Sequence, residues 1–406
     1  MRPRPGRLSG RDESLLETRG ELSSTELSEL ARRAGLRRVA ILAWRDLDDP
    51  EAGGSELHAH EVARRWAAAG IDVVLRTSSV SGRAVSIERD GYTAVRRSGR
   101  YGVFATGPMD IAGGRLGPLD GLVEIWNGMP FLSPMWSGLP RVVFMHHVHG
   151  EMWSMALPPT LARAGKFLEA RLAPPVYNRS RIVTLSESSR REIVALPWVQ
   201  ASRVSVVSPG IDPRYSPGGH RSERPLVVAI GRLVPVKNFG RLVGILARVH
   251  EQIPELEAII VGEGRERSSL EDRLVELGAK SYVSLPGRLG AEELLDLYRR
   301  AWVVASASTR EGWGLTLSEA AACATPAVAT RIAGHLDAID DGVTGVLVDS
   351  EEDFARELKT LLCDPLLRRR LGRAAVEHVA PLTWEATARG TLAALAAEAR
   401  RTPPRS

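Results

Sequence analysis

The sequence predicts an α/β protein of two Rossmann-like domains, whose parallel sheets face a central cleft. The chain has 406 residues, which at about 150 residues per domain indicates two domains. Short apolar, β-branched runs alternate with amphipathic helical stretches along most of it, as is typical of parallel sheets covered on both faces. A Gly- and Pro-rich stretch, Pro209–Gly219, interrupts this alternation near the middle of the chain.

The first half of the chain contains an extension and one domain. Residues 1–37 are expected to form an N-terminal extension with one short helix, and residues 38–208 the first domain. Its strands are expected at Arg38–Leu42, Asp72–Thr77, Leu122–Trp126, Arg141–Met145, Ile182–Thr184 and Val204–Val207. Its helices are expected at Ser55–Ala69, Leu157–Leu172 and Glu187–Ala195.

The second half repeats the pattern after a linker at residues 209–224, and its domain is expected to span residues 225–380. The strands are expected at Leu226–Ile230, Glu257–Val261, Tyr282–Leu285, Trp302–Ala305, Ala327–Ala329 and Val346–Val348. The helices are expected at Asn238–Ile253, Glu266–Leu277, Ala291–Arg300, Leu315–Ala322 and Glu352–Leu362. Ligands of such sheets bind at the carboxyl ends of the strands, so the loops there are the first candidates for a site.

The formal net charge of +5 is concentrated in the two ends of the chain. Residues 1–38 hold nine Arg and six acidic residues, and the basic tail at residues 399–406 holds three Arg and no acid. The remaining body therefore carries a net charge of −1, which argues against a nucleic-acid partner. Lysine is scarce, with four Lys against fifty Arg, so a Lys in a candidate loop carries more weight than an Arg.

The cysteine count and the hydropathy pattern bear on location. Two cysteines, Cys323 and Cys363, do not make a disulfide framework, and this favours a reducing compartment. No apolar run approaches the ~18 residues of a membrane-spanning helix, and the N-terminus lacks the apolar core of a secretory signal. We therefore expect a cytoplasmic protein.

The first chemical motif is Arg310–Ala321, which follows a strand and opens a helix. Two glycines at the turn leave backbone N–H groups exposed at the positive end of the helix, which predicts an anion site. Glu311 and Glu319 are separated by up to about 12 Å along a helix. This suits opposite ends of a sugar nucleotide and is too wide for the ~5 Å carboxylate pair of a retaining glycosidase. The alternative is that Glu319 is a solvated helix residue and that Glu311 is only a negative charge favoured by the helix dipole.

The second motif is the loop Gly231–Asn238, directly after a strand. Arg232 and Lys237 place two cations at the carboxyl edge of the predicted sheet, where they can neutralise a diphosphate. The alternative is a loop with solvated charges.

Two further segments contain candidate site residues. Gly53 and Gly54 follow the first strand without the spacing of a dinucleotide fingerprint, and they can still approach a phosphate. The simpler interpretation is a helix capped by Ser55, and both can hold together. His146, His147 and His149 cluster at the end of another strand. A metal site is conceivable there, but no Cys or HExxH partner is nearby, so we favour a His that hydrogen-bonds a sugar or acceptor.

In this order, the segments resemble the retaining glycosyltransferases of family 4. These are group 1 glycosyltransferases, with glycogen synthase-like and mannosyltransferase-like members, and they have the two-domain GT-B fold. The likeness covers about residues 38–395. It rests on the Glu-x7-Glu element (Glu311, Glu319), the Gly-Arg-Leu-x-x-x-Lys element (Gly231, Arg232, Lys237), the Gly-Gly-Ser-Glu loop (Gly53–Glu56), the linking turn Val207–Asp212, the strand end Val183–Glu187 and the last helix at Leu382–Glu385.

The resemblance implies a role for each matching residue. Arg232 and Lys237 would hold the donor diphosphate, Glu311 the donor sugar and Glu319 the ribose. The other donor contacts implied are Gly54, Gly231, Gly312, Trp313, Gly314 and Leu315, the last four through their backbone, and His146 would contact the sugar or the acceptor. The first domain would bind the acceptor and the second the nucleotide sugar, and a helix at residues 381–398 would cross back to the first domain.

The resemblance also implies the reaction. A hexose would move with retention from a UDP- or GDP-linked donor to a hydroxyl of a glycan, lipid-linked or small-molecule acceptor. Cations and helix N-termini would stabilise the leaving diphosphate, so neither a metal nor another cofactor would be needed. One departure is Ala333–Asp337, where the family has Gly-Gly-x-Pro-Glu; the missing Glu puts a substrate contact there in doubt.

Two alternatives belong to other classes of protein. One is a sugar-nucleotide epimerase on the same fold, although Glu311 and Glu319 are too widely spaced to act on one carbon. The other is a non-catalytic protein that binds a glycan or the periphery of a membrane. Within Leu157–Leu172, basic and apolar side chains alternate as in a helix that lies on anionic lipid, or in one that packs on its own sheet. These residues are Leu161, Arg163, Lys166, Phe167, Leu168 and Arg171.

Overall fold

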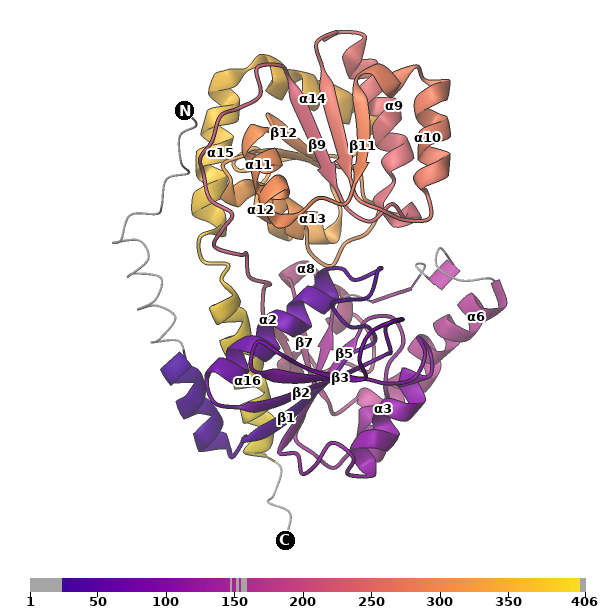
Figure 1. Cartoon of the computed structure of the whole chain (residues 1–406), viewed down its shortest axis with the longest axis vertical. Coiled ribbons are helices and arrows are strands. Elements are labelled where there is room, and N and C mark those ends of the chain that lie inside the picture. Colours follow the sequence, from indigo (N-terminus) through magenta and orange to yellow (C-terminus); the bar gives the residue numbers. More distant parts are fainter. Residues whose placement is uncertain (1–23, 147, 151–152, 155–158, 402–406) are drawn as a thin grey trace.

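The computed structural model describes residues 24–146, 148–150, 153–154 and 159–401. The N-terminal extension is therefore described only from residue 24 and the basic tail only to residue 401. Two α/β domains follow one another along the longest axis of the molecule (Figure 1). This confirms the predicted fold class.

The N-terminal domain is built on an eight-stranded sheet with the order β3-β4-β2-β1-β5-β6-β7-β8. All neighbours are parallel except β3 and β4. The strands are β1 (Arg38–Leu42), β2 (Asp72–Thr77), β3 (Ser86–Arg89), β4 (Tyr92–Arg96), β5 (Gly121–Trp126), β6 (Arg141–Met145), β7 (Arg181–Thr184) and β8 (Val204–Val206). The central strands β1, β5 and β6 are buried except for the first residue of β1 and of β6, because helices cover both faces of a parallel sheet.

One described helix of this domain precedes β1, and the others lie between the strands. Residues 24–34 are helical. The others are α2 (Gly54–Ala68), α3 (Val103–Ala112), α4 (Ser133–Trp136), α6 (Pro159–Phe167), the π-helical turn η1 (Leu168–Leu172), α7 (Ala173–Tyr177), α8 (Glu187–Val194) and the 3₁₀ turn η2 (Ala201–Arg203). The helix predicted at Leu157–Leu172 is thus divided into α6 and η1, and residues 157–158 lie outside the described part.

The C-terminal domain has a six-stranded, fully parallel sheet with the order β11-β10-β9-β12-β13-β14. Its strands are β9 (Leu226–Ile230), β10 (Glu257–Val261), β11 (Val283–Gly287), β12 (Val303–Ser306), β13 (Ala327–Thr330) and β14 (Gly345–Val348). Counted within the domain, this order is 3-2-1-4-5-6, the doubly wound arrangement whose ligand crevice opens between the first and fourth strands. The loops after β9 and β12 therefore flank the expected binding position.

Helices cover both faces of this sheet. They are η3 (Pro235–Lys237), α9 (Phe239–His250), α10 (Arg267–Glu276), η4 (Ala279–Ser281), α11 (Ala291–Arg300), α12 (Leu315–Ala322), α13 (Ala333–Ala338), α14 (Glu351–Cys363) and α15 (Pro365–Val379). In α9 the buried residues Leu242, Val243, Leu246 and Val249 recur at helical spacing, so one face of this helix packs on the sheet.

The last helix, α16 (Trp384–Ala399), packs on the N-terminal domain, as Figure 1 shows for its yellow ribbon beside the indigo α2. The indole Nε1 of Trp66 on α2 donates to the carbonyl of Ala388 at 3.0 Å. The chain therefore passes between the domains twice, and the two passages touch: the backbone N–H of Ile211 donates to the carbonyl of Leu382 at 3.0 Å. Among the described residues, no helix is long and apolar enough to cross a membrane.

Candidate active site

The loops after β9 and β12 bring the two predicted motifs together. The Lys237 ammonium forms an ion pair with Glu311 Oε1, and Ser308 Oγ donates to the same oxygen at 2.8 Å. Burial raises the pKa of Glu311, but the nearby charge of Lys237, reinforced by His335 and these hydrogen bonds, outweighs it and makes the net shift downward. Glu311 is therefore held as a carboxylate, and Lys237 is not the solvated charge of the alternative interpretation of its loop.

The backbone around Lys237 explains the residue types of this loop. Asn238 has a positive φ of 54°, which Asn tolerates better than most residues. Gly231 faces the Lys237 side chain, and a Cβ at this position would lie 3.2 Å from Lys237 Cε. A side chain at residue 231 would therefore require the Lys237 side chain to shift by a few tenths of an ångström.

Arg232 points across the domain boundary toward the loop after β1. Its Nε lies 3.6 Å from the position of a Cβ on Gly53. Its guanidinium makes no hydrogen bond or ion pair with the described residues, and its pKa is lowered, first by burial and then by the positive charge of Arg45. Glu56, Glu51 and Glu311 raise this pKa and only partly offset the burial. A buried guanidinium without a hydrogen-bond partner among the described residues is a candidate contact for an anion.

Arg45 was not singled out in the sequence. It lies in the loop after β1, its side chain is almost fully buried, and it forms ion pairs with Glu56 at 3.2 Å and Glu51 at 3.3 Å. Its position in the sequence could have identified it as a candidate site residue, because it follows the carboxyl end of β1 just as Arg232 follows that of β9.

The two glycines at the start of α2 have different surroundings. The N–H of Gly53 donates to Glu56 Oε2 at 2.8 Å, and α2 begins at Gly54. A Cβ on Gly54 would meet no atom within 4 Å, so this position is open to an approaching ligand. The prediction that Ser55 caps the helix is wrong: Ser55 lies inside α2, and its Oγ accepts a hydrogen bond from Asn127 at 3.0 Å.

The loop between Glu311 and α12 presents backbone rather than side chains. The indole of Trp313 is buried and donates to Ser318 Oγ at 2.9 Å, so its side chain points into the protein. Gly314 precedes the first residue of α12, Leu315. Gly312 contributes its carbonyl, which accepts hydrogen bonds from Ser186 and Ser189 of the N-terminal domain at 3.3 and 3.4 Å.

Glu319 lies in α12 and is only 9% exposed, so the alternative of a solvated helix residue is wrong. The hydroxyl of Tyr298 donates to its Oε2 at 2.7 Å. Burial raises the pKa of Glu319 to about 7 despite this hydrogen bond. Tyr298, on α11, was not predicted, and its place in an apolar helical pattern gave no signal beyond core packing.

His146 follows β6 and is 5% exposed. Its ring lies edge-on to that of His58, with 5.5 Å between centroids, and neither ring nitrogen of either residue has a hydrogen-bond partner among the described atoms. Burial lowers the pKa of His146 to about 4, so the ring is neutral near pH 7 and has one donor and one acceptor nitrogen to offer.

His149 has surroundings different from those of His146. The backbone N–H of His149 donates to Glu169, and its ring packs edge-on against Trp153 at 4.8 Å. His147 lies outside the described residues. Within the described part of the chain, no three His, Cys, Asp or Glu side chains converge as metal ligands.

Two family models together cover most of the chain. The model "Glycosyltransferase Family 4" matches residues 52–215, and the model "Glycosyl transferases group 1" matches residues 216–378. A D-inositol 3-phosphate glycosyltransferase of Kribbella flavida is 30% identical over 412 residues, with 88% of this chain and 95% of its own length covered.

The chain belongs to glycosyltransferase family 4. It is therefore a transferase. This finding favours the glycosyltransferase hypothesis over the epimerase and the non-catalytic alternatives. Solved structures show the same GT-B fold. Sucrose-phosphate synthase of Thermosynechococcus elongatus superposes with a TM-score of 0.73 at 21% identity, covering 87% of this chain and 96% of its own. Anabaena HepE, solved with UDP-glucose, gives 0.69 at 17% identity, covering 88% and 98%.

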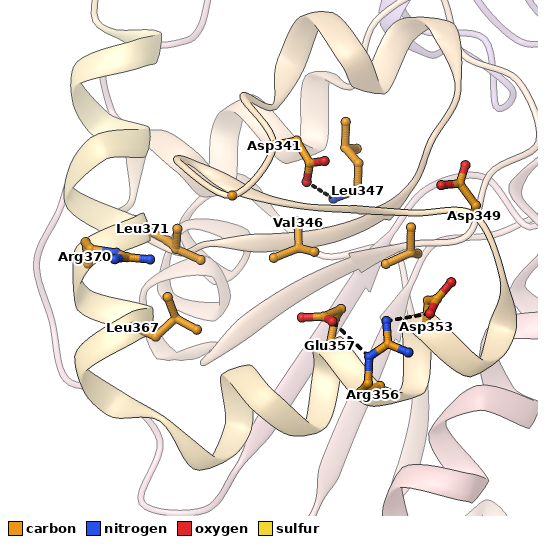
Figure 2. Close-up of a pocket in the computed structure, with 12 residues that line it drawn as sticks. Asp341, Val346, Leu347, Asp349, Asp353, Arg356, Glu357, Leu367, Arg370 and Leu371 are labelled. Atoms are coloured by element: carbon orange, nitrogen blue, oxygen red, sulfur yellow. Dashed lines mark hydrogen bonds and ion pairs between the residues drawn. The ribbon is translucent and has the colours of Figure 1, made fainter.

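One hollow of the glycosyltransferase lies away from these motifs. It has a volume of about 450 Å³ and includes residues of β14, α14 and α15 (Figure 2). Asp353 and Glu357 both pair with Arg356 at its wall. None of the predicted donor-binding residues lines it, so it is not the candidate active site.

The basic amphipathic segment of this glycosyltransferase is exposed on the N-terminal domain. Phe167 and Leu172 are 57% and 50% exposed, and Arg163 and Arg171 are also exposed. Leu168 is only partly exposed. This apolar and basic surface is not packed on the sheet of its own domain.

Proposed function

We propose that this family 4 enzyme transfers a hexose from a UDP- or GDP-linked donor to a hydroxyl acceptor, with retention of configuration and without a metal. The observation that carries the proposal is the arrangement at the carboxyl ends of β9 and β12. There the Lys237–Glu311 ion pair lies on the same loops as Arg232, a guanidinium with no partner among the described residues.

In this proposal Arg232 and Lys237 bind the donor diphosphate. Both charges are partly shielded from water, where an ionic hydrogen bond to phosphate is stronger than at an exposed surface. As the bond between sugar and phosphate breaks, negative charge grows on the leaving diphosphate, and preorganised cations and the N-terminus of α12 stabilise it. The leaving phosphate takes the acceptor proton on the face it has just left, which gives retention.

The two glutamates hold opposite ends of the donor. Glu311, kept ionised by Lys237, accepts hydrogen bonds from sugar hydroxyls, and Glu319 accepts them from the ribose. The N-terminal domain binds the acceptor, with the neutral His146 as a hydrogen-bonding group toward the sugar or the acceptor hydroxyl. UDP-glucose and D-inositol 3-phosphate, named in the comparisons above, are the first donor and acceptor to try.

The site is tested by substitution. A screen of UDP-, GDP- and ADP-sugars for thermal stabilisation identifies the donor, since a ligand that binds only the folded state raises apparent stability. Lys237→Ala and Glu311→Gln are then expected to lose about a hundredfold or more of kcat/KM while keeping the wild-type circular dichroism spectrum, as expected when one preorganised charge is removed.

The control variant is Lys280→Ala, which removes an exposed Lys of the same domain and should leave transfer unchanged. Full activity in both Lys237→Ala and Glu311→Gln would refute the assignment. The anomeric configuration of the product, measured by NMR, decides retention, and activity after exhaustive chelation decides whether a metal is required.

We also propose that the enzyme works in a reducing, cytoplasmic compartment and contacts the membrane surface peripherally. The described chain contains two free cysteines, one buried and one exposed. The surface that favours membrane contact is formed by Phe167 and Leu172 with the neighbouring Arg163 and Arg171.

A further inference from the structure

A carboxylate of the C-terminal domain occupies the N-terminus of a helix in the N-terminal domain. Asp337 lies on α13, and α8 begins at Glu187. Asp337 Oδ1 accepts the backbone N–H of Glu187 at 3.1 Å, both of its oxygens lie 3.3 Å from the N–H of Ser188, and Oδ2 also accepts the Ser188 hydroxyl.

This contact satisfies groups that the helix cannot satisfy alone. The first N–H groups of an α-helix have no partner within the helix. In α8 the cap residue Ser186 accepts only the N–H of Ser189, at 3.1 Å. Asp337 therefore completes the cap of α8 from the other domain, and its charge is favourable at the positive end of the helix.

The same turn of α8 contacts both sides of the candidate active site. The hydroxyls of Ser186 and Ser189 point to the carbonyl of Gly312, next to Glu311. Ser189 Oγ also lies 3.5 Å from the carbonyl of His146. One helical turn thus connects the donor-sugar loop of the C-terminal domain with the histidine of the N-terminal domain.

Helix α13, which carries Asp337, is itself packed under the donor-sugar loop. A Cβ on Gly334 would lie 2.6 Å from the carbonyl oxygen of Glu311 and 2.8 Å from the N of Trp313, so only glycine fits there. An ion pair between the domains, Arg310 to Glu192 at 2.6 Å, lies about one turn further along α8.

We propose that Asp337 is a positioning residue that fixes α8, and with it His146, against the donor-sugar loop. Its carboxylate is used between the domains rather than on the substrate, which accounts for an Asp at the position where the resemblance led us to look for a substrate-binding Glu. The catalytic part of this inference rests on the proposed function, whereas the contact between the domains does not.

The test uses Asp337→Asn in the full-length protein, with Asp340→Asn as the matched control. Asp340 is an exposed carboxylate just after the same helix, and its side chain forms no hydrogen bond or ion pair with the described residues. In Asp337→Asn, the amides of Glu187 and Ser188 are expected to exchange hydrogen about tenfold faster. We expect kcat/KM to fall about tenfold through kcat, with the affinity for the free nucleotide unchanged.

The outcomes separate the contact from the catalysis. Unchanged exchange in Asp337→Asn, or equal effects in Asp340→Asn, would overturn the contact. Faster exchange with unchanged kcat would overturn the positioning role, and so would a weaker nucleotide affinity that accounts for the whole loss. If the wild-type enzyme transfers no sugar from any donor, the proposed function fails, and the exchange data still decide whether Asp337 fixes α8. Asp337→Glu, which keeps the charge, should recover part of both effects.

Discussion

Two carboxylates eight residues apart experience opposite surroundings in this enzyme. Glu311 has the Lys237 ammonium beside it, and its pKa is lowered in spite of burial. The carboxylate of Glu319 accepts a hydrogen bond from the hydroxyl of Tyr298, and burial raises its pKa to about 7. Each carboxylate is therefore kept in a different balance between its charged and neutral forms, by neighbours that are distant in sequence.

The raised pKa of Glu319 predicts how stability depends on pH. Between pH 4.5 and about 7 the folded protein holds a proton at Glu319 that the unfolded chain has released, so this group's contribution falls as pH rises through that window. Glu319→Gln should remove this penalty and raise the free energy of unfolding at pH 8 by up to about 3 kcal/mol relative to wild type, and much less at pH 5.

Urea denaturation of both proteins at pH 5 and pH 8 measures this difference. The exposed Glu377 on α15 supplies the control, since Glu377→Gln should leave the pH profile unchanged. A Glu319→Gln profile parallel to that of the wild type would show that the burial of Glu319 has no such effect.

At the scale of elements, the strands that could be predicted are those with apolar, β-branched runs. Strands β3 and β4 were not predicted. Strand β3, with the sequence SIER, lies at the sheet edge and alternates between exposed and partly buried positions, whereas β4, with the sequence YTAVR, is mostly buried. A signal was present in Asp90-Gly91, where both residues have a positive φ, as a two-residue hairpin turn requires. Helix α15, which was also not predicted, had a sequence signal at its start, since Asp364 caps it and Pro365 is its first residue.

The candidate active site could be predicted only for residues that belong to a local sequence motif. The loops with Arg232, Lys237, Glu311 and Glu319 follow predicted strands, and the structure brings Lys237 and Glu311 together. The contributions of Tyr298 and Asp337 depend on contacts with residues of other elements, Glu319 and the start of α8, and no local pattern specifies those contacts.

The return of α16 to the N-terminal domain predicts a large effect of one substitution. Trp384 is 2% exposed, and a Cβ on Gly210 in the linking segment would lie only 2.2 Å from its backbone N. Trp384→Ala should lower the free energy of unfolding by about 3–5 kcal/mol, because a large buried side chain leaves a cavity. Thermal and urea denaturation measure the change.

The control for this element is Phe167→Ala, which truncates an aromatic side chain that is 57% exposed and should change stability little. Similar stabilities for Trp384→Ala and the wild type would mean that the N-terminal domain holds its structure without the last helix in place.

For the whole molecule, the net charge of +5 is less informative than the arrangement of charge on its surface. The exposed segment with Phe167, Leu172, Arg163 and Arg171 combines apolar and basic side chains in the manner of helices that lie on anionic lipid. We expect the protein to float with vesicles that contain anionic lipid at low salt, and to be released at about 0.5 M salt, where exposed charges are screened.

The double variant Arg163→Glu with Arg171→Glu should abolish flotation. The same change in charge at the exposed Arg369 and Arg373 of α15 is the control and should preserve it. A wild-type protein that stays with the soluble fraction at low salt would exclude this contact.

The position of α16 also has a consequence during synthesis on the ribosome. Leu395 of α16 packs over β5, because a Cβ on Gly121 would lie 3.1 Å from it and 3.0 Å from Leu36. The N-terminal domain is therefore the first to emerge and the last to be completed. At about 5–20 residues per second, translation from the end of β8 to the end of α16 takes roughly 10–40 s. Until α16 emerges, the apolar surface over β5 that Leu395 later covers stays exposed and accessible to chaperones.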